Sequence, residues 1–169
     1  MIEKLDVYDR EKMKIGKIVE RKKGEKLNKG EYIIAVQCWI INSKGEILLT
    51  QRKLNKTHGG MWEPTSGLVI SGETSAQGIK RELLEEIGLD ILEDEIILTK
   101  EIIEEREDIS FLRDIYVIKK DITLNELNFN DGEVINVKYV TIEKLAEMIQ
   151  NGESFEWLEY FLDLYKEIK

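Results

Sequence analysis

The sequence predicts an α/β fold in which a mixed β-sheet lies between helices. Residues 32–42 form a nearly continuous run of β-branched and aromatic side chains, which is typical of a buried central strand. Residues 74–88 carry apolar side chains at helical spacing, which indicates an amphipathic helix. The expected order along the chain is strands, helix, strands and then two helices, which fits a sheet between helices.

The first 30 residues are highly charged, and two short apolar alternations, at residues 5–7 and 15–18, predict a hairpin or an edge structure. We therefore expect two parts in the chain. Residues 1–30 should form a hairpin-like arm packed on the domain, and residues 31–169 should form the domain itself.

Further strands are expected from apolar or alternating runs at residues 46–50, 95–100, 109–121 and 134–140.

The connections and the C-terminal helices are predicted from polar and capping residues. The strongly acidic segment 101–108 is expected to be a solvated turn, with a source of metal ligands as the alternative. Thr141 is expected to cap a helix over residues 142–150, and a last amphipathic helix should begin near Ser154. Its aromatic stripe is interpreted as core packing, with a homodimer interface as the alternative.

Composition limits the classes of function. The chain of 169 residues is long enough for one domain with a full core, and its 25 basic against 34 acidic side chains give a net charge of −9. This charge opposes nonspecific nucleic-acid binding. The sequence shows neither a secretory signal nor a membrane span, so a cytoplasmic location is expected. The single cysteine, Cys38, excludes an internal disulfide and is interpreted as a small buried hydrophobic residue.

Three glutamates on the helix at residues 74–88 are candidate metal ligands. Glu82, Glu85 and Glu86 are spaced i, i+3 and i+4, so they should share one helix face. Like charges so placed repel by a few tenths of a kcal/mol per pair, roughly, and a divalent cation would offset this. Carboxylate oxygens are the ligands that Mg²⁺ and Mn²⁺ prefer.

The segment before this helix is expected to complete the site. Residues 67–73 are bounded by glycines and should form a loop whose backbone can approach a metal and a phosphate. Ser66, directly before Gly67, is a further candidate metal ligand. Arg81 is expected to pair with Glu73 or Glu85 and to hold the loop against the helix.

A polar and basic segment, residues 51–60, provides candidates for substrate binding. Arg52 is the best candidate for a phosphate clamp because its planar guanidinium binds phosphate in a bidentate manner; the alternative is a surface residue at a strand end. Trp62 and Glu63 are candidate walls of the same site, with packing as the alternative for Trp62. His58, the only histidine, is interpreted as a solvated loop residue.

The pattern from Gly67 to Leu89 resembles the Nudix box at every defined position. It consists of Gly67, five residues, Glu73, seven residues and then the run Arg81-Glu82-Leu83-Leu84-Glu85-Glu86-Ile87-Gly88-Leu89. Gly67, Glu73, Arg81 and Gly88 would be the structural members of the box. The resemblance is tight here and looser elsewhere, where the N-terminal arm and residues 39–52 look like the isopentenyl-diphosphate-isomerase-like branch of the superfamily.

The resemblance implies a Nudix-type α/β/α sandwich and a Mg²⁺-dependent hydrolase. Such an enzyme cleaves a nucleoside diphosphate derivative by attack of water on phosphorus. The metal ions would be held by Glu82, Glu85 and Glu86. The resemblance in the segment that follows the box further along the chain implies that Glu133 is an additional carboxylate of the site. Glu82, Glu85 and Glu133 are therefore the catalytic candidates, with the general base left open between Glu82 and Glu133.

Three other functions are alternatives to this hydrolase. An isomerase is rejected because Ser66 and Leu68 stand where that family has a catalytic Cys and a His. A coenzyme A pyrophosphatase is the runner-up, since residues 48–60 match only the first part of its signature. A catalytically silent nucleotide-binding module would show degenerate box glutamates, and none is missing.

Overall fold

The computed structural model describes residues 3–21, 26–129 and 132–169, and the chain forms two compact units. The first unit comprises the chain up to residue 38 together with residues 66–82 and 91–117. The second comprises residues 39–65, 83–90 and 118–169. No helix within the described ranges is long and apolar enough to cross a membrane.

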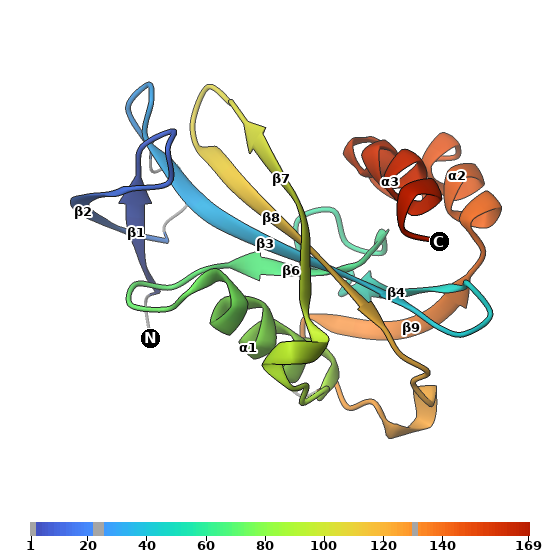
Figure 1. Ribbon diagram of the computed structural model, residues 1–169. Coiled ribbons are helices and arrows are strands. Elements are labelled where there is room, and N and C mark those ends of the chain that lie inside the picture. The colour runs from blue at the N-terminus through green and yellow to red at the C-terminus, as the bar shows by residue number, and fades with distance from the viewer. Residues whose placement is uncertain (1–2, 22–25, 130–131) are drawn as a thin grey trace. The chain divides into compact units, whose positions relative to one another are not determined.

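The strands and helices have the following bounds: β1 Lys4–Tyr8, β2 Lys14–Glu20, β3 Tyr32–Ile41, β4 Ile47–Arg52, β5 Trp62–Glu63, β6 Thr65–Leu68, α1 Ser75–Ile87, β7 Ile97–Glu104, β8 Ser110–Lys119, β9 Val134–Val140, α2 Ile142–Gln150 and α3 Tyr160–Ile168 (Figure 1). Three short 3₁₀ helices are η1 Glu93–Glu95, η2 Leu124–Glu126 and η3 Glu156–Glu159.

The first unit is organised around β3, whose residues are all buried, as the β-branched run predicted. Strands β1, β6 and β8 pair with β3, and β7 pairs with β8. Strands β1 and β2 form an antiparallel pair with Leu5 opposite Val19. The two strands expected in the N-terminal arm are thus present, while the domain boundary at residue 30 stays a prediction. Cys38 is buried as expected, and burial raises the pKa of its thiol.

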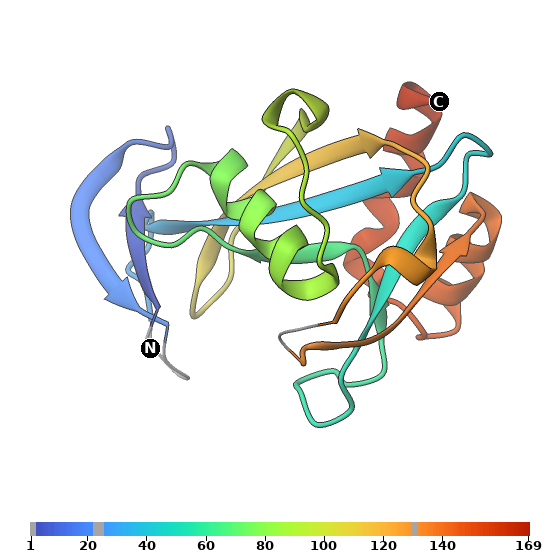
Figure 2. The ribbon, with the colours of Figure 1, turned by 90° about the horizontal axis from the view of Figure 1, so that it is seen from below.

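The second unit is organised around β4, which pairs with β5, with β9 and with the end of β3. Helices α2 and α3 lie next to each other, in orange and red in Figures 1 and 2. The Trp39 ring stacks on Phe161 with 3.6 Å between ring centroids, and its Nε1 donates to the Tyr160 hydroxyl at 2.9 Å. Phe161 and Tyr165 are buried, which confirms that the aromatic stripe forms core packing.

The helix expected at residues 74–88 is α1, which begins in the first unit and ends in the second. Thr74 and Gln77 form the predicted capping box: the Gln77 N–H donates to the Thr74 hydroxyl at 3.2 Å, and the Thr74 N–H donates to the Gln77 side chain at 2.9 Å. Gly88 then adopts a φ of 69°, the left-handed conformation that closes the helix.

Four boundaries differ from the prediction because tertiary contacts decide them. The last helix, α3, begins at Tyr160 rather than near Ser154, whose hydroxyl donates instead to the Trp62 carbonyl oxygen at 2.6 Å. The expected acidic turn at 101–108 starts later, since β7 continues to Glu104, whose carboxylate accepts hydrogen bonds from Arg113 and Arg106.

The third difference concerns the segment expected to be a loop from Gly67 onward. Its first two residues belong to β6, which pairs with β3. The strand β4 likewise extends to Arg52, which is part of the polar and basic segment 51–60. Both extensions depend on partner strands that lie far away in the sequence.

A buried ionic network ties the β1–β2 turn to β8 and to the start of α1. The Asp114 side chain is 1% exposed, and Lys12 Nζ donates to its two oxygens at 2.7 and 2.8 Å. The Ser75 hydroxyl donates to the same carboxylate, and the Tyr116 hydroxyl donates to Ser75 at 2.8 Å. Burial acts to lower the pKa of Lys12, but its hydrogen bonds to Asp114 and Glu101 outweigh burial and raise it.

We expect Asp114→Ala to destabilise the protein by about 3–5 kcal/mol, because the substitution leaves the Lys12 ammonium without its buried counter-charge. Asp108→Ala is the matched control. Asp108 also pairs with a lysine, Lys26, at 2.7 Å, but the two side chains are 65% and 70% exposed, so the cost should stay below about 1 kcal/mol. Urea unfolding of both variants measures the difference, and equal costs would contradict a structural role for the network.

Candidate functional site

The first unit holds the N-terminal half of the box, and Arg81 is its central contact. Arg81 Nε donates to Glu73 at 2.9 Å, one of the two partners expected from the sequence. Its terminal nitrogens donate to Glu82 at 2.8 Å and to the Leu68 carbonyl oxygen at 2.8 Å. Burial acts to lower the pKa of Arg81, but these hydrogen bonds outweigh burial and raise it, so the guanidinium stays charged.

Gly67 brings the backbone of β6 against the Glu82 carboxyl group. A Cβ atom at residue 67 would overlap that carboxyl group, so a side chain here cannot coexist with the observed Glu82 position. The carboxylate is therefore held between the backbone of β6 and Arg81. Ser66, the other loop candidate, is the preceding residue of β6 and is partly buried.

The second unit holds the C-terminal half of α1, where the remaining box glutamates differ in exposure. Glu85 is exposed, whereas Glu86 is 8% exposed because it borders the apolar stripe of Leu83 and Ile87. The acidic face of the helix thus runs from solvent to the edge of the core.

These carboxylates fit a hard divalent cation in the chemistry of their donor atoms. They offer oxygen ligands at i, i+3 and i+4, and Glu82 lies against a stretch of backbone that carries no side chain at Gly67. Within the ranges that the structure describes, no three His, Cys, Asp or Glu side chains already converge as a metal cluster.

Arg52 and Glu63 meet in the second unit at the ends of β4 and β5. Arg52 donates to the Glu63 carboxylate at 2.5 Å and through Nε to the Thr57 carbonyl oxygen at 3.0 Å. The Glu63 side chain is 9% exposed. One edge of the Arg52 guanidinium is thus held by a nearly buried carboxylate, while the Arg52 side chain remains 29% exposed.

Trp62 lies on the other face of β5 from Glu63, because successive residues of a strand point to opposite faces. The structure therefore separates Trp62 from the Arg52–Glu63 pair, although all three were expected in one site. The ring is buried, and Lys138 Nζ lies 3.9 Å from its centroid. Burial lowers the pKa of Lys138. The position of Lys138 beside the ring could have been anticipated only from the alternation of side chains along β9.

Glu133 lies beside the basic loop that follows β4. Its carboxylate accepts a hydrogen bond from Lys56 Nζ at 2.5 Å, and its carbonyl oxygen accepts one from the Lys53 N–H at 2.8 Å. Both side chains of the Lys56–Glu133 pair are about half exposed, at 43% and 45%. The sequence indicated Glu133 but gave no signal for Lys56 as its partner. His58 is exposed, as expected.

Comparison with known proteins identifies the family. The sequence model of the NUDIX domain matches residues 31–161. An uncharacterised Nudix hydrolase of Listeria innocua is 33% identical over 149 residues, which cover 87% of this chain and 85% of the relative.

Two solved structures share the fold. The MutT protein of Methanosarcina mazei has a TM-score of 0.66 at 24% identity, covering 80% of this chain and 94% of its own. The protein DR0079 of Deinococcus radiodurans has a TM-score of 0.67 at 21% identity, covering 89% and 90%.

The family model and the Listeria innocua relative, together with the carboxylate-bearing helix, identify a pyrophosphohydrolase on an α/β fold. The chain belongs to the Nudix hydrolase family, whose members generally cleave pyrophosphate bonds in nucleoside diphosphate derivatives. This confirms the predicted fold class and the interpretation of the box, while the placement in the isomerase-like branch stays a prediction.

We expect Gly67→Ala to weaken Mn²⁺ binding about tenfold or more, because the added Cβ displaces the Glu82 carboxylate. Gly72→Ala is the control: it strains a residue with a φ of 94° but meets no atom within 4 Å, so it should lower stability and leave Mn²⁺ affinity unchanged. Calorimetric titration with Mn²⁺, together with thermal unfolding, separates the two effects. Unchanged affinity in a folded Gly67→Ala protein would show that Glu82 is no metal ligand.

Proposed function

We propose that this protein is a Mg²⁺- or Mn²⁺-dependent hydrolase that cleaves a diphosphate linkage in a nucleoside diphosphate derivative by attack of water on phosphorus. The observation that carries the proposal is the contact set of Arg81, which joins Glu73, Glu82 and the Leu68 carbonyl oxygen. These hydrogen bonds pair Arg81 with acidic residues of the box, which would otherwise repel one another. They also fix the first metal-ligand candidate relative to the loop before α1.

Glu82, Glu85 and Glu86, with Ser66 as a further candidate, would hold the divalent cation. Such a cation, when bound, neutralises charge on the diphosphate and lowers the pKa of a coordinated water. The chain supplies the remaining functions. Arg52 is proposed to bind a substrate phosphate with the part of its guanidinium that Glu63 does not use, and Glu63 positions it for that role.

The two candidate general bases differ in how firmly they are held. Glu82 is fixed by Arg81, which is only 20% exposed. The Lys56–Glu133 pair is about half exposed, so opening it costs less than about 1 kcal/mol. A base must change partners when it accepts the proton of the attacking water, and this favours Glu133. Glu85, the third catalytic candidate, would then act through the metal.

The remaining expectations concern binding partners. The proposed partner is a small nucleoside diphosphate derivative, with no role in nucleic-acid binding. Base stacking on Trp62 would require the Lys138 ammonium to leave the ring, so we favour the packing alternative for Trp62 over a role in substrate binding. A cytoplasmic location and a homodimer stay predictions.

A substrate panel with Mg²⁺ tests the proposed function. The panel contains nucleoside di- and triphosphates, ADP-ribose, dinucleoside polyphosphates, nucleotide sugars, NADH and coenzyme A, and released phosphate is measured after coupling to a phosphatase. At least one nucleoside diphosphate derivative should be turned over. Cleavage of coenzyme A alone would establish the runner-up, and no turnover by a folded, metal-binding protein would indicate a catalytically silent binding module.

Glu82→Gln and Glu86→Gln should each lower turnover by about 100-fold or more while preserving the fold, because each substitution removes a negative ligand and keeps the side-chain shape. Turnover of the unaltered protein should also disappear in EDTA.

Glu93→Gln, on the exposed helix η1, is the matched control and should keep normal turnover. Circular dichroism verifies that all three variants are folded. Full activity in EDTA, or a Glu86→Gln enzyme with a normal rate, would show that the acidic face is only solvated.

A further inference from the structure

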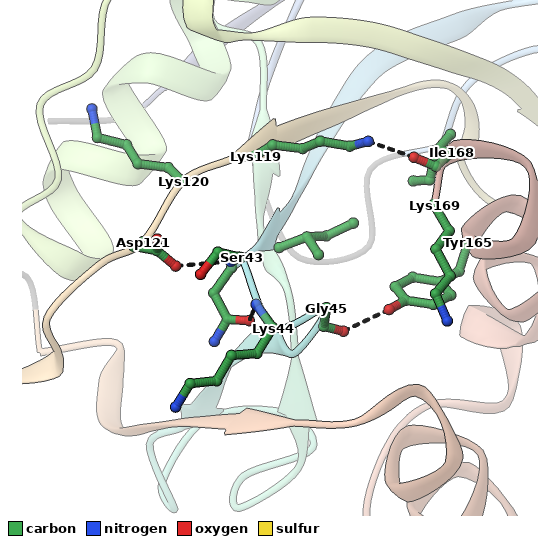
Figure 3. A pocket seen from close by; sticks show the side chains of 11 residues that line it. Ser43, Lys44, Gly45, Lys119, Lys120, Asp121, Tyr165, Ile168 and Lys169 are labelled. Atoms are coloured by element: carbon green, nitrogen blue, oxygen red, sulfur yellow. Dashed lines mark hydrogen bonds between the residues drawn. The ribbon is translucent and has the colours of Figure 1, made fainter.

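The second unit contains a cavity of about 460 Å³ that none of the candidate site residues lines. Three segments of this unit form it: the end of β3 with the following turn at residues 41–45, the end of β8 with the following residues at 119–121, and three residues at the end of α3, Tyr165, Ile168 and Lys169 (Figure 3). The cavity is therefore distinct from the box, from the Arg52–Glu63 pair and from Glu133.

The lining residues are strongly basic in a chain whose net charge is −9. Four lysines line the cavity, Lys44, Lys119, Lys120 and Lys169, against one acidic side chain, Asp121. The Asp121 carboxylate already accepts the Ser43 backbone N–H at 2.8 Å, and this hydrogen bond lowers its pKa. The charge of the cavity is thus opposite in sign to that of the whole molecule, which favours an anionic ligand.

Two of the lysines have no carboxylate in direct contact among the described residues. Lys119 Nζ donates to the Ile168 carbonyl oxygen at 2.6 Å, which is a neutral acceptor (Figure 3). Lys44 acts on Asp121 through space, and among the residues that the structure describes neither Lys44 nor Lys119 forms a salt bridge. Donation to the Ile168 carbonyl oxygen gives Lys119 a structural role at the end of α3.

The rest of the wall is partly apolar and is held by a hydrogen bond. The Tyr165 hydroxyl donates to the Gly45 carbonyl oxygen at 2.6 Å, which fastens the β3–β4 turn to α3. A side chain at residue 45 would meet that hydroxyl at 2.7 Å, so the glycine is required for this approach. Ile41 and Ile168 complete the wall. A fixed wall facing flexible lysines suits a small ligand that carries a compact anionic group.

We propose that this cavity is a second anion site, which binds a small phosphorylated molecule through Lys44 and Lys119. The site is independent of hydrolysis, because its residues belong neither to the box nor to the proposed substrate contacts. The phosphate group of the ligand would replace the Ile168 carbonyl oxygen as an acceptor for Lys119. It would also bind the ammonium of Lys44.

The test is a ¹H–¹⁵N NMR titration with inorganic pyrophosphate at constant ionic strength, in EDTA so that no divalent ion is present. The backbone amides of residues 43–45 and 119–121 should show the largest, saturable shifts. Lys44→Ala/Lys119→Ala should weaken binding about tenfold or more, because both charge-assisted contacts are lost. If the double variant does not fold, Lys44→Ala alone, in an exposed turn, should still weaken binding.

The control is Lys144→Ala/Lys166→Ala, which removes the same charge from α2 and α3 of the same unit. These lysines pair with Glu147 and Asp163 on their own helices and do not line the cavity. The control should keep the affinity within about twofold, since screened distant charges contribute little. An equal loss in both double variants, or the largest shifts elsewhere in the protein, would overturn the proposal.

Discussion

The contact on which the box depends is the guanidinium of Arg81. It satisfies two carboxylates and one carbonyl oxygen from three places in the chain, and it is itself only 20% exposed. A buried ion pair of this kind adds little net stability, but removal of one partner leaves the others as uncompensated charges. The position of the loop and the position of the Glu82 carboxylate are therefore set together, and neither can change alone.

The same principle recurs in the rest of this acidic chain. The nearly buried Glu63 is paired with Arg52, and the buried Asp114 with Lys12. Acidic residues are in excess, so carboxylates are available to pair with these cations. Lys119, beside the β3–β4 turn, differs, because it donates to the Ile168 carbonyl oxygen rather than to a carboxylate.

Local chemistry made much of the fold predictable. The capping box at Thr74, the bounds of β9 and the Thr141 cap of α2 all depend on residues within a few positions, and the structure has them as expected. Strand β6 was missed because Thr65–Leu68 is short and its strand character comes from pairing with β3. The late start of α3 was missed because the Ser154 hydroxyl, a normal capping group, is used by the Trp62 carbonyl oxygen.

The residue types of the candidate site were predictable from the sequence, but which of these residues lie close together was less so. The i, i+3, i+4 spacing and the box pattern indicated the carboxylates on α1 directly. The separation of Trp62 from Glu63 follows from strand alternation, but two residues are too few for a strand to be recognised in sequence. The Lys56–Glu133 contact joins residues 77 positions apart, and a charge pattern alone carries no information at that range.

Because Cys38 is buried, chemical labelling of its thiol reports when the core around β3 opens. The thiol lies in β3, is 1% exposed, and has its pKa raised by burial, so the reactive thiolate is withheld while the strand stays in place. A thiol reagent can label each chain only once, and only when the central strand has separated from its neighbours. The rate of that labelling measures how often the core of the first unit opens under native conditions.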